Sequence, residues 1–330
     1  MRFYKITGNL VVALLVGCGG VSDSSTSTTT SRAYVVNKSS NTVTVIDTTN
    51  NLVSATVNVG VSPSGIAVHP TNSRAYVANF GSDTVSIIDT SSNTLAATVA
   101  VGVNPFGVAV HPTANLVYVA NGGDPLTPST VSIIDTTSNT VVATANVGRR
   151  PYGLAVDPAN NRLYVGNSMD GTISVINTIT NALVTTVNVG AYPAGLALHA
   201  AANLLYVANF LSNSISVVDT TTNLVIDTVF VGTNPSGVAV HPTANRFYVA
   251  DGWDGSVPST FYVMDLTNNS NVVTVTVGVS AMDVAVDATM NRVYVTNGGS
   301  NTVSVIDTTT NMVVATIAVG NNPGNVAVVP

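Results

Sequence analysis

A unit of 42 residues that repeats along the chain constrains the fold more than any other feature of the sequence. A clear copy runs from Gly65 to Phe106 and holds four short apolar runs separated by turns. A Tyr-Val-x-Asn or Tyr-Val-x-Asp quartet marks the copies and starts at Tyr34, Tyr76, Tyr118, Tyr164, Tyr206, Tyr248 and Tyr294. A glycine closes the copies at Gly60, Gly102, Gly148, Gly190, Gly232, Gly278 and Gly320. Because both series advance in steps of 42 or 46 residues, the chain is a repeat protein.

The apolar runs of each copy predict β-strands. Thr84 to Ile88 is typical, being rich in Thr, Val and Ile, which pack well on a pleated surface. Turn residues such as Pro70 to Ser73 separate the runs, and no segment beyond the N-terminus shows a helical period. Four antiparallel strands in a unit of about 40 residues are typical of a propeller blade. A single blade cannot bury both of its faces, so we expect the blades to stack in a ring.

The two ends of the repeat region predict how the ring closes. The region begins at Arg32, in the second strand of a unit, and ends with Asn325 to Val328, which is a first strand. A sheet shared between these two ends would remove the open edges of a linear array. We therefore expect an all-β fold, a single seven-bladed propeller in which a C-terminal first strand joins the N-terminal three strands. The alternative, an open β-solenoid, gives no reason for a first strand to stop the chain.

The repeat resembles that of the YVTN β-propeller family, whose units carry a Tyr-Val-Thr-Asn strand and an Asn-Pro-x-Gly-Val-Ala-Val segment. This chain has Tyr294-Val295-Thr296-Asn297 and, from Asn234 to Val240, Asn-Pro-Ser-Gly-Val-Ala-Val. The resemblance spans roughly residues 32–330. It implies the propeller fold, and it implies little about activity, because such propellers are scaffolds that host many functions. Related proteins are often surface or periplasmic proteins.

The N-terminal 17 residues have the pattern of a signal peptide. Arg2 and Lys5 precede the apolar run Leu10 to Val16, which is too short to span a bilayer. The sequence Leu-Val-Gly-Cys that ends at Cys18 resembles the bacterial lipobox, in which cleavage before the cysteine leaves a lipidated residue. Gly19 then indicates the outer membrane if the cell is Gram-negative, since the retention signal is Asp at that position. The alternative is an ordinary signal peptide, with Cys18 an exposed thiol.

Residues 18–31 are rich in Ser and Thr and predict a flexible tether, with the propeller following over residues 32–330. About a dozen such residues reach roughly 20 Å. Ten Lys and Arg face 16 Asp, with no Glu, for a net charge of −6. No basic stripe is present, which argues against nucleic acid as a partner. The expected partners are a membrane, through lipid on Cys18, and an envelope protein or glycan bound by a monomeric propeller.

Two sets of polar residues recur once per blade and are therefore interpreted as turn or packing features. His69, His111, His199 and His241 share the slot after the first strand, which Asp157 and Asp287 fill in other blades. Positions spread around a ring cannot converge on one tetrahedral zinc. Third-strand aspartates precede turns whose backbone N–H groups they can bind, at Asp47, Asp89, Asp135, Asp219, Asp265 and Asp307, with Asn177 in the remaining blade.

Residues that depart from the repeat are better candidates for function. The loop after the second strand is expected to share one face with the linker into the next blade. Consecutive linkers there carry aromatic and arginine residues, which are typical interface anchors. The predicted binding-face residues are Phe106, Arg149, Arg150, Tyr152, Tyr192, Trp253 and Met282. The alternative is that they are ordinary variable loop residues.

These observations predict a non-catalytic interaction module of the cell envelope, without a cofactor. The alternative is a lactonase-like hydrolase or lyase with a divalent metal at the channel mouth. Such enzymes use Glu, Asp and Asn ligands, but Glu is absent, leaving Asp251, Asp254 and Asp283 as oxygen ligands suited to Ca²⁺ or Mg²⁺. A covalent c-type haem is excluded, because the chain contains no Cys-x-x-Cys-His.

Overall fold

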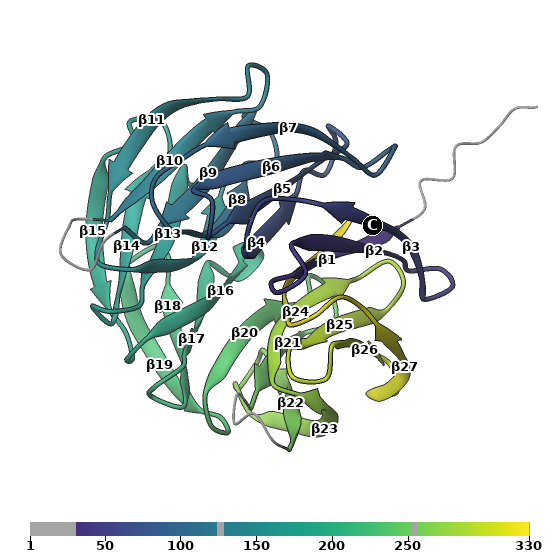
Figure 1. The fold of residues 1–330 in the computed structure, drawn as a ribbon. Helices are drawn as coiled ribbons and strands as arrows, with labels where there is room; N and C mark the ends of the chain where they lie inside the picture. The colour runs from purple at the N-terminus through teal and green to yellow at the C-terminus, as the bar shows by residue number, and fades with distance from the viewer. Residues whose placement is uncertain (1–30, 124–128, 253–256, 330) are drawn as a thin grey trace, which may run out of the picture.

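The computed structural model is a ring of seven four-stranded antiparallel sheets (Figure 1). It describes residues 31–123, 129–252 and 257–329. Within these ranges the one helical element is a short 3-10 turn, η1 (Ala200–Ala202), and no helix is long and apolar enough to cross a membrane. The predicted all-β, seven-bladed propeller is confirmed.

Each blade begins with an innermost strand beside the central axis and continues outward. The innermost strands are β4 (Pro63–Val68), β8 (Pro105–Val110), β12 (Pro151–Asp157), β16 (Pro193–His199), β20 (Pro235–Val240), β24 (Ala281–Asp287) and β28 (Pro323–Val329). The second strands, which contain the Tyr-Val quartets, are β1 (Arg32–Asn37), β5 (Arg74–Asn79), β9 (Leu116–Asn121), β13 (Arg162–Asn167), β17 (Leu204–Asn209), β21 (Arg246–Asp251) and β25 (Arg292–Asn297).

The two outer strands of each blade complete the sheet. The third strands are β2 (Thr42–Asp47), β6 (Thr84–Asp89), β10 (Thr130–Asp135), β14 (Thr172–Asn177), β18 (Ser214–Asp219), β22 (Pro258–Asp265) and β26 (Thr302–Asp307). The outermost strands are β3 (Leu52–Asn58), β7 (Thr94–Ala100), β11 (Thr140–Asn146), β15 (Leu183–Asn188), β19 (Leu224–Phe230), β23 (Asn271–Val279) and β27 (Met312–Ala318).

The two ends of the chain form one blade together, as predicted. Strand β28 pairs antiparallel with β1, so that Val326 faces Val35 and Val328 faces Ala33. Figure 1 shows the C-terminus beside the purple N-terminal strands. Ser31, the last residue of the expected tether, contacts the propeller, since its hydroxyl oxygen lies 2.7 Å from an Asp287 carboxylate oxygen and 2.8 Å from the Val329 carbonyl oxygen.

The apolar core lies between neighbouring blades. In one cluster Tyr34 and Val45, from the blade that contains both termini, pack against Ile66 and Val77 of the next blade. The tyrosine of every quartet is almost fully buried in such a layer. Because each core layer needs two blades, no blade buries its apolar residues alone, which is why the repeat must form a closed ring.

A contact between a glycine and an asparagine joins neighbouring blades at six of the seven junctions, and Asp251 replaces the asparagine at the seventh. The N–H of Gly60, at the end of one unit, donates to Oδ1 of Asn79 in the following blade at 3.1 Å. Nδ2 of Asn79 donates to the Ser86 hydroxyl at 3.0 Å. A β-carbon added at Gly60 would lie 2.5 Å from Cγ of Asn79, so only glycine fits. Gly320 approaches Asn37 in the same way and closes the ring.

Three of the four repeated histidines shape turns, as their shared slot predicts, whereas Nδ1 of the fourth, His199, has no hydrogen-bond partner among the described residues. Nδ1 of His69 accepts the backbone N–H groups of Thr71 and Asn72, both at 3.2 Å. His111 and His241 make the same contacts, and a carboxylate oxygen of Asp157 or Asp287 replaces the imidazole in two blades. Burial lowers the pKa of His69, His111 and His241, which keeps the accepting nitrogen unprotonated near neutral pH.

Deleting residues 325–330 from a chain that starts at Ser31 tests the closure. The deletion removes most of β28 and leaves β1 as an open edge beside a split core layer. We expect a loss comparable with the total stability of a typical domain, about 5–15 kcal/mol, because the ring opens. Denaturant unfolding followed by circular dichroism measures this, with the intact Ser31–Pro330 chain as reference. A truncated chain that unfolds at the same denaturant concentration would contradict the shared-blade closure.

Candidate functional site

The linkers between blades and the loops after the second strands lie together on one face, as predicted. The N–H of Phe80, after β5, donates to the carbonyl of Ser62 at 3.1 Å. The same bond joins Ser168 to Arg150, and Phe210 to Tyr192, each at 3.0 Å. Six of the seven linkers are tied in this way to the loop of the blade that they enter. This pairing gives the face a rigid backbone from which different side chains project.

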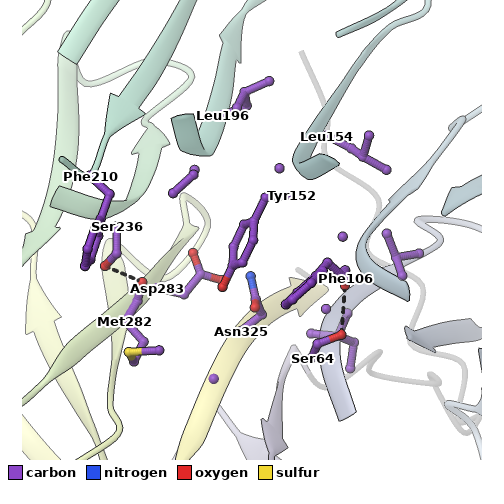
Figure 2. A pocket seen from close by; sticks show the side chains of 18 of the residues that line it. Ser64, Phe106, Tyr152, Leu154, Leu196, Phe210, Ser236, Met282, Asp283 and Asn325 are labelled. Carbon is purple, nitrogen blue, oxygen red and sulfur yellow. Dashed lines mark hydrogen bonds between the residues drawn. The ribbon is translucent and has the colours of Figure 1, made fainter. Parts of the chain in front are cut away.

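A central cavity of about 380 Å³ is lined by the innermost strands and by residues of this face. Five of the predicted binding-face residues contribute to its lining, namely Phe106, Arg150, Tyr152, Tyr192 and Met282. Figure 2 shows Phe106, Tyr152 and Met282 arranged around it. Residues distant in the sequence are brought together because every innermost strand borders the same axis. Trp253 and Asp254 lie outside the described residues.

Aromatic rings form an arc around this cavity. The ring centroid of Phe106 lies 4.8 Å from that of Phe80 and 4.9 Å from that of Tyr152. Further along, Tyr192 and Phe210 pair at 5.7 Å. Such tilted pairs stabilise each other and hold their ring faces in fixed directions. We call the five residues Phe80, Phe106, Tyr152, Tyr192 and Phe210 the aromatic arc.

Arg150 bridges the two parts of the aromatic arc. Its guanidinium carbon lies 5.8 Å from the ring centroid of Phe106 and 5.8 Å from that of Tyr192. The side chain is otherwise exposed, so its N–H donors remain available to the solvent side of the cavity. A guanidinium held by two rings presents a positive charge with a defined orientation.

Arg150 and Tyr192 also occupy an unusual backbone position. One residue in each linker has a left-handed conformation, and most linkers use Ser or Asn there, as at Asn104 and Asn234. Arg150 has a φ of 51° and Tyr192 a φ of 58°. Larger side chains in this region cost stability, and such strain concentrates at functional sites. These two adjacent linkers therefore keep the side chains of Arg150 and Tyr192 although Asn or Ser would adopt this backbone conformation more easily.

Arg149, the remaining predicted face residue among those described, points away from the cavity. Its Nε lies 2.7 Å from Oδ1 of Asp170, and its backbone N–H binds the same carboxylate. It lines a smaller hollow of about 180 Å³ on the outer side of Phe106, next to Met169. The adjacent arginines thus have different roles, since Arg149 is paired and Arg150 faces the cavity.

Glycines allow the innermost strands to approach closely around the channel. At Gly107, for example, an added β-carbon would lie 2.1 Å from the carbonyl oxygen of Tyr152 in the next blade. Five blades have glycine at this position, and the remaining two have Asp283 and Asn325. These two adjacent blades are therefore the place where polar side chains enter the channel.

Asp283 and Asn325 lie together in the cavity, facing Tyr152 (Figure 2). Oδ2 of Asp283 accepts the backbone N–H of Val326 at 3.1 Å. Surrounding protein atoms desolvate the carboxylate and raise its pKa to about 6, an effect that hydrogen bonds from Val326, Val284 and Asn325 reduce. Burial likewise raises the pKa of Tyr152 to about 12, and the charge of Asp283 contributes.

Sequence reasoning identified Asp283 only as a weak metal ligand, and it missed three residues of the cavity. Phe80 and Phe210 follow second strands in a slot that Gly or Ser fills in four other blades, so their departure was visible in the repeat. Asn325 was visible as a substituted glycine. Its position beside Asp283 follows from the stacking of consecutive blades, because β24 and β28 are the innermost strands of neighbouring units.

The structure separates the acids of the metal hypothesis. Asp251 occupies the quartet position where other blades have asparagine, and its Oδ2 accepts the backbone N–H of Thr233 at 2.9 Å. It is buried at the blade junction beside Gly232, whereas Asp283 faces the channel. Within the described residues, no group of three or more His, Cys, Asp or Glu side chains could hold a metal ion.

Comparison with known proteins establishes the fold. No family model matches the sequence, and no curated protein matches it. The chain is similar in structure to a protein of unknown function from Desulfotomaculum acetoxidans, with a TM-score of 0.78, 18% identity and coverage of 90% of this chain and 98% of that one. It is also similar to hydrazine synthase from Kuenenia stuttgartiensis, with a TM-score of 0.72, 19% identity and coverage of 83% and 91%. At these identities the likeness concerns the fold alone.

Replacing Asp283 with Asn, the residue that occupies the equivalent position in the next blade, tests the electrostatics of the cavity. A folded-state pKa near 6 lies above the unfolded value, so wild-type stability falls as pH rises from about 4 through 6. Asp283→Asn removes this dependence. We expect the difference in free energy of unfolding between the variant and the wild type to grow in favour of the variant from about pH 4 to pH 6 and to level off above that, at up to roughly 2–3 kcal/mol. Urea unfolding between pH 4 and pH 8 measures the difference, and a constant difference would show an unperturbed carboxylate.

Proposed function

We propose that this protein is a lipid-anchored binding module of the cell envelope. Its propeller acts without catalysis and holds an envelope protein or glycan at the face that contains the aromatic arc and Arg150. The observation that supports this most strongly is the gathering of aromatic and arginine side chains from consecutive linkers around one cavity. The repeat itself resembles that of YVTN propellers, which fits an interaction scaffold.

The chemistry of this face favours binding. Tyr and Arg are enriched among the residues that dominate interface energies, because they combine a large apolar surface with directed hydrogen bonds. Rings already packed against each other lose little side-chain entropy when a partner binds. The strained backbone at Arg150 and Tyr192 adds a second argument, since a purely structural linker would have Asn or Ser there.

The anchoring part of the proposal depends on the N-terminal sequence. The apolar run that ends at Cys18 has the pattern of a lipoprotein signal, and Gly19 favours the outer membrane in a Gram-negative cell. The tether that follows ends at Ser31, which is bonded to the propeller. The lipid would thus hold a monomeric propeller close to the membrane surface.

Replacing Cys18 with Ala tests the anchor. A single thiol is the acceptor for the lipid, so Cys18→Ala should abolish incorporation of labelled fatty acid and transfer the protein from the membrane fraction to the soluble extracytoplasmic fraction. Cell fractionation and labelling in the native host, or in a heterologous Gram-negative host, measure both effects. A wild-type protein that incorporates no label would refute lipid anchoring and leave the binding face as a separate question.

A triple variant that restores repeat residues tests the binding face. In Phe106→Ser, Arg150→Asn and Tyr152→Ala each new residue is one that other linkers carry in the same slot, at Ser64, Asn104 and Ala194. The variant should therefore fold normally. We expect the wild-type domain to capture an envelope protein or glycan with an affinity that the variant reduces at least tenfold, or about 1.4 kcal/mol. Pull-down from envelope extracts and biolayer interferometry measure this.

A matched control separates this effect from general surface changes. Leu95→Thr, Val142→Thr and Leu183→Thr alter three exposed residues of outermost strands, away from the cavity. This control should capture the partner as the wild type does. Equal capture by all three proteins, or capture by none, would remove the aromatic face from the proposal.

A further inference from the structure

We propose that the central cavity binds a quaternary ammonium group, with the cation beside Asp283 and an attached anionic group at Arg150. This inference rests on the proposed function, because it names the ligand class of the same face. Three features of the described residues support it. They are an uncompensated carboxylate, a wall of aromatic and thioether groups, and an arginine at the rim.

The carboxylate of Asp283 forms no ion pair within the described residues, although Lys38 and Arg150 also line the cavity. Four ion pairs are formed within the described residues, and none includes Asp283. Its hydrogen-bond donors, from Val326, Val284 and Asn325, are all uncharged. They orient the carboxylate without neutralising it. A desolvated charge of this kind is destabilising unless something pairs with it, and the raised pKa reflects that cost. A cation in the cavity would supply the missing charge.

The walls around Asp283 favour a cation that brings methyl groups rather than N–H donors. Phe106, Tyr152 and Met282 line the same cavity as the carboxylate, and Figure 2 shows the ring of Tyr152 extending toward Asp283. Aromatic rings attract N-methylated ammonium ions through their quadrupoles, and such ions require no hydrogen-bond acceptor. A primary ammonium has three N–H donors, and each of them would need a hydrogen-bond acceptor in the cavity.

Backbone acceptors near the cavity are already engaged. The hydroxyl of Ser64 donates to the Phe106 carbonyl at 3.0 Å, and the hydroxyl of Ser236 donates to the Met282 carbonyl at 2.7 Å. Both bonds are drawn in Figure 2. These two carbonyls thus have serine donors, and a ligand rich in N–H groups would find fewer partners there than one with methyl groups. We therefore expect the cavity wall to select methylated ammonium groups over groups with N–H donors, as an aromatic cage does.

Arg150 adds a preference for ligands that carry a negative charge besides the ammonium group. Arg150 lines the same cavity as Asp283 and Tyr152. A ligand with an ammonium and an anionic group could contact Asp283 and Arg150 at once. This chemistry is present in a free solute with a carboxylate, such as a betaine, and in a phosphocholine group on a lipid or glycan.

Calorimetric titration of the wild-type domain with choline and with its uncharged carbon isostere, in which a tert-butyl group replaces trimethylammonium, tests the cation site. We expect choline to bind at least roughly tenfold more tightly than the isostere. Asp283→Asn should remove this preference. The control Asp227→Asn makes the same change of charge on an outermost strand and should retain it.

The anion site is tested with phosphocholine, glycine betaine and phosphatidylcholine vesicles. At least one of the two soluble zwitterions should bind more tightly than choline, and Arg150→Asn should cancel this gain. Vesicle binding would assign the group to a lipid, and binding of the soluble zwitterions alone would assign it to a solute or glycan.

Three results would overturn the inference. They are equal affinity for choline and its isostere, unchanged choline binding by Asp283→Asn, and no choline binding up to 50 mM, roughly tenfold above the weakest affinities that such cages are expected to give. The capture experiment with the triple variant then shows whether the proposed function fails as well. A partner that the wild type captures and the variant loses would leave the binding module standing with a ligand of other chemistry.

Discussion

The contact between a closing glycine and the quartet asparagine of the next blade is the constraint on which the ring depends. The asparagine accepts a backbone N–H from the preceding unit and donates within its own blade, so one buried amide connects two sheets. The absence of a side chain at the glycine is what permits the approach. This explains why the two most regular markers in the sequence are a glycine and an asparagine. They are the two halves of one junction.

The last junction has the greatest consequence, because Gly320 meets Asn37 near the other end of the chain. Together with the pairing of β28 and β1, it converts a row of blades into a ring in which every apolar layer is covered on both sides. Asp251 shows how the junction tolerates change. It replaces the asparagine, and a carboxylate oxygen accepts the N–H of Thr233. A residue that the sequence offered as a metal ligand is thereby explained as part of the framework.

We expect functional residues at positions that depart from the repeat and gain no stability by doing so. Arg150 and Tyr192 hold left-handed backbone that Asn and Ser would hold more easily. Asp283 places an unpaired charge in a slot that glycine fills in five blades. Each departure costs stability, and all three border the same cavity. A conflict between local preference and observed residue is the expected signature of a functional site. Structural neighbours at 18% and 19% identity share the scaffold, and that likeness concerns the fold alone.

The sequence by itself determined the strands, the number of blades and the way in which the ring closes, because these depend on short-range patterns and on counting repeats. It also identified the linkers that carry aromatic residues. Only the tertiary structure decided that Asn325 joins Asp283, that Phe80 and Phe210 extend the aromatic arc, and that Arg149 turns to Asp170 while Arg150 faces the cavity. The reason is geometric. Neighbours across a closed ring are set by the curvature of the whole assembly, and adjacent side chains in a linker can point to opposite sides.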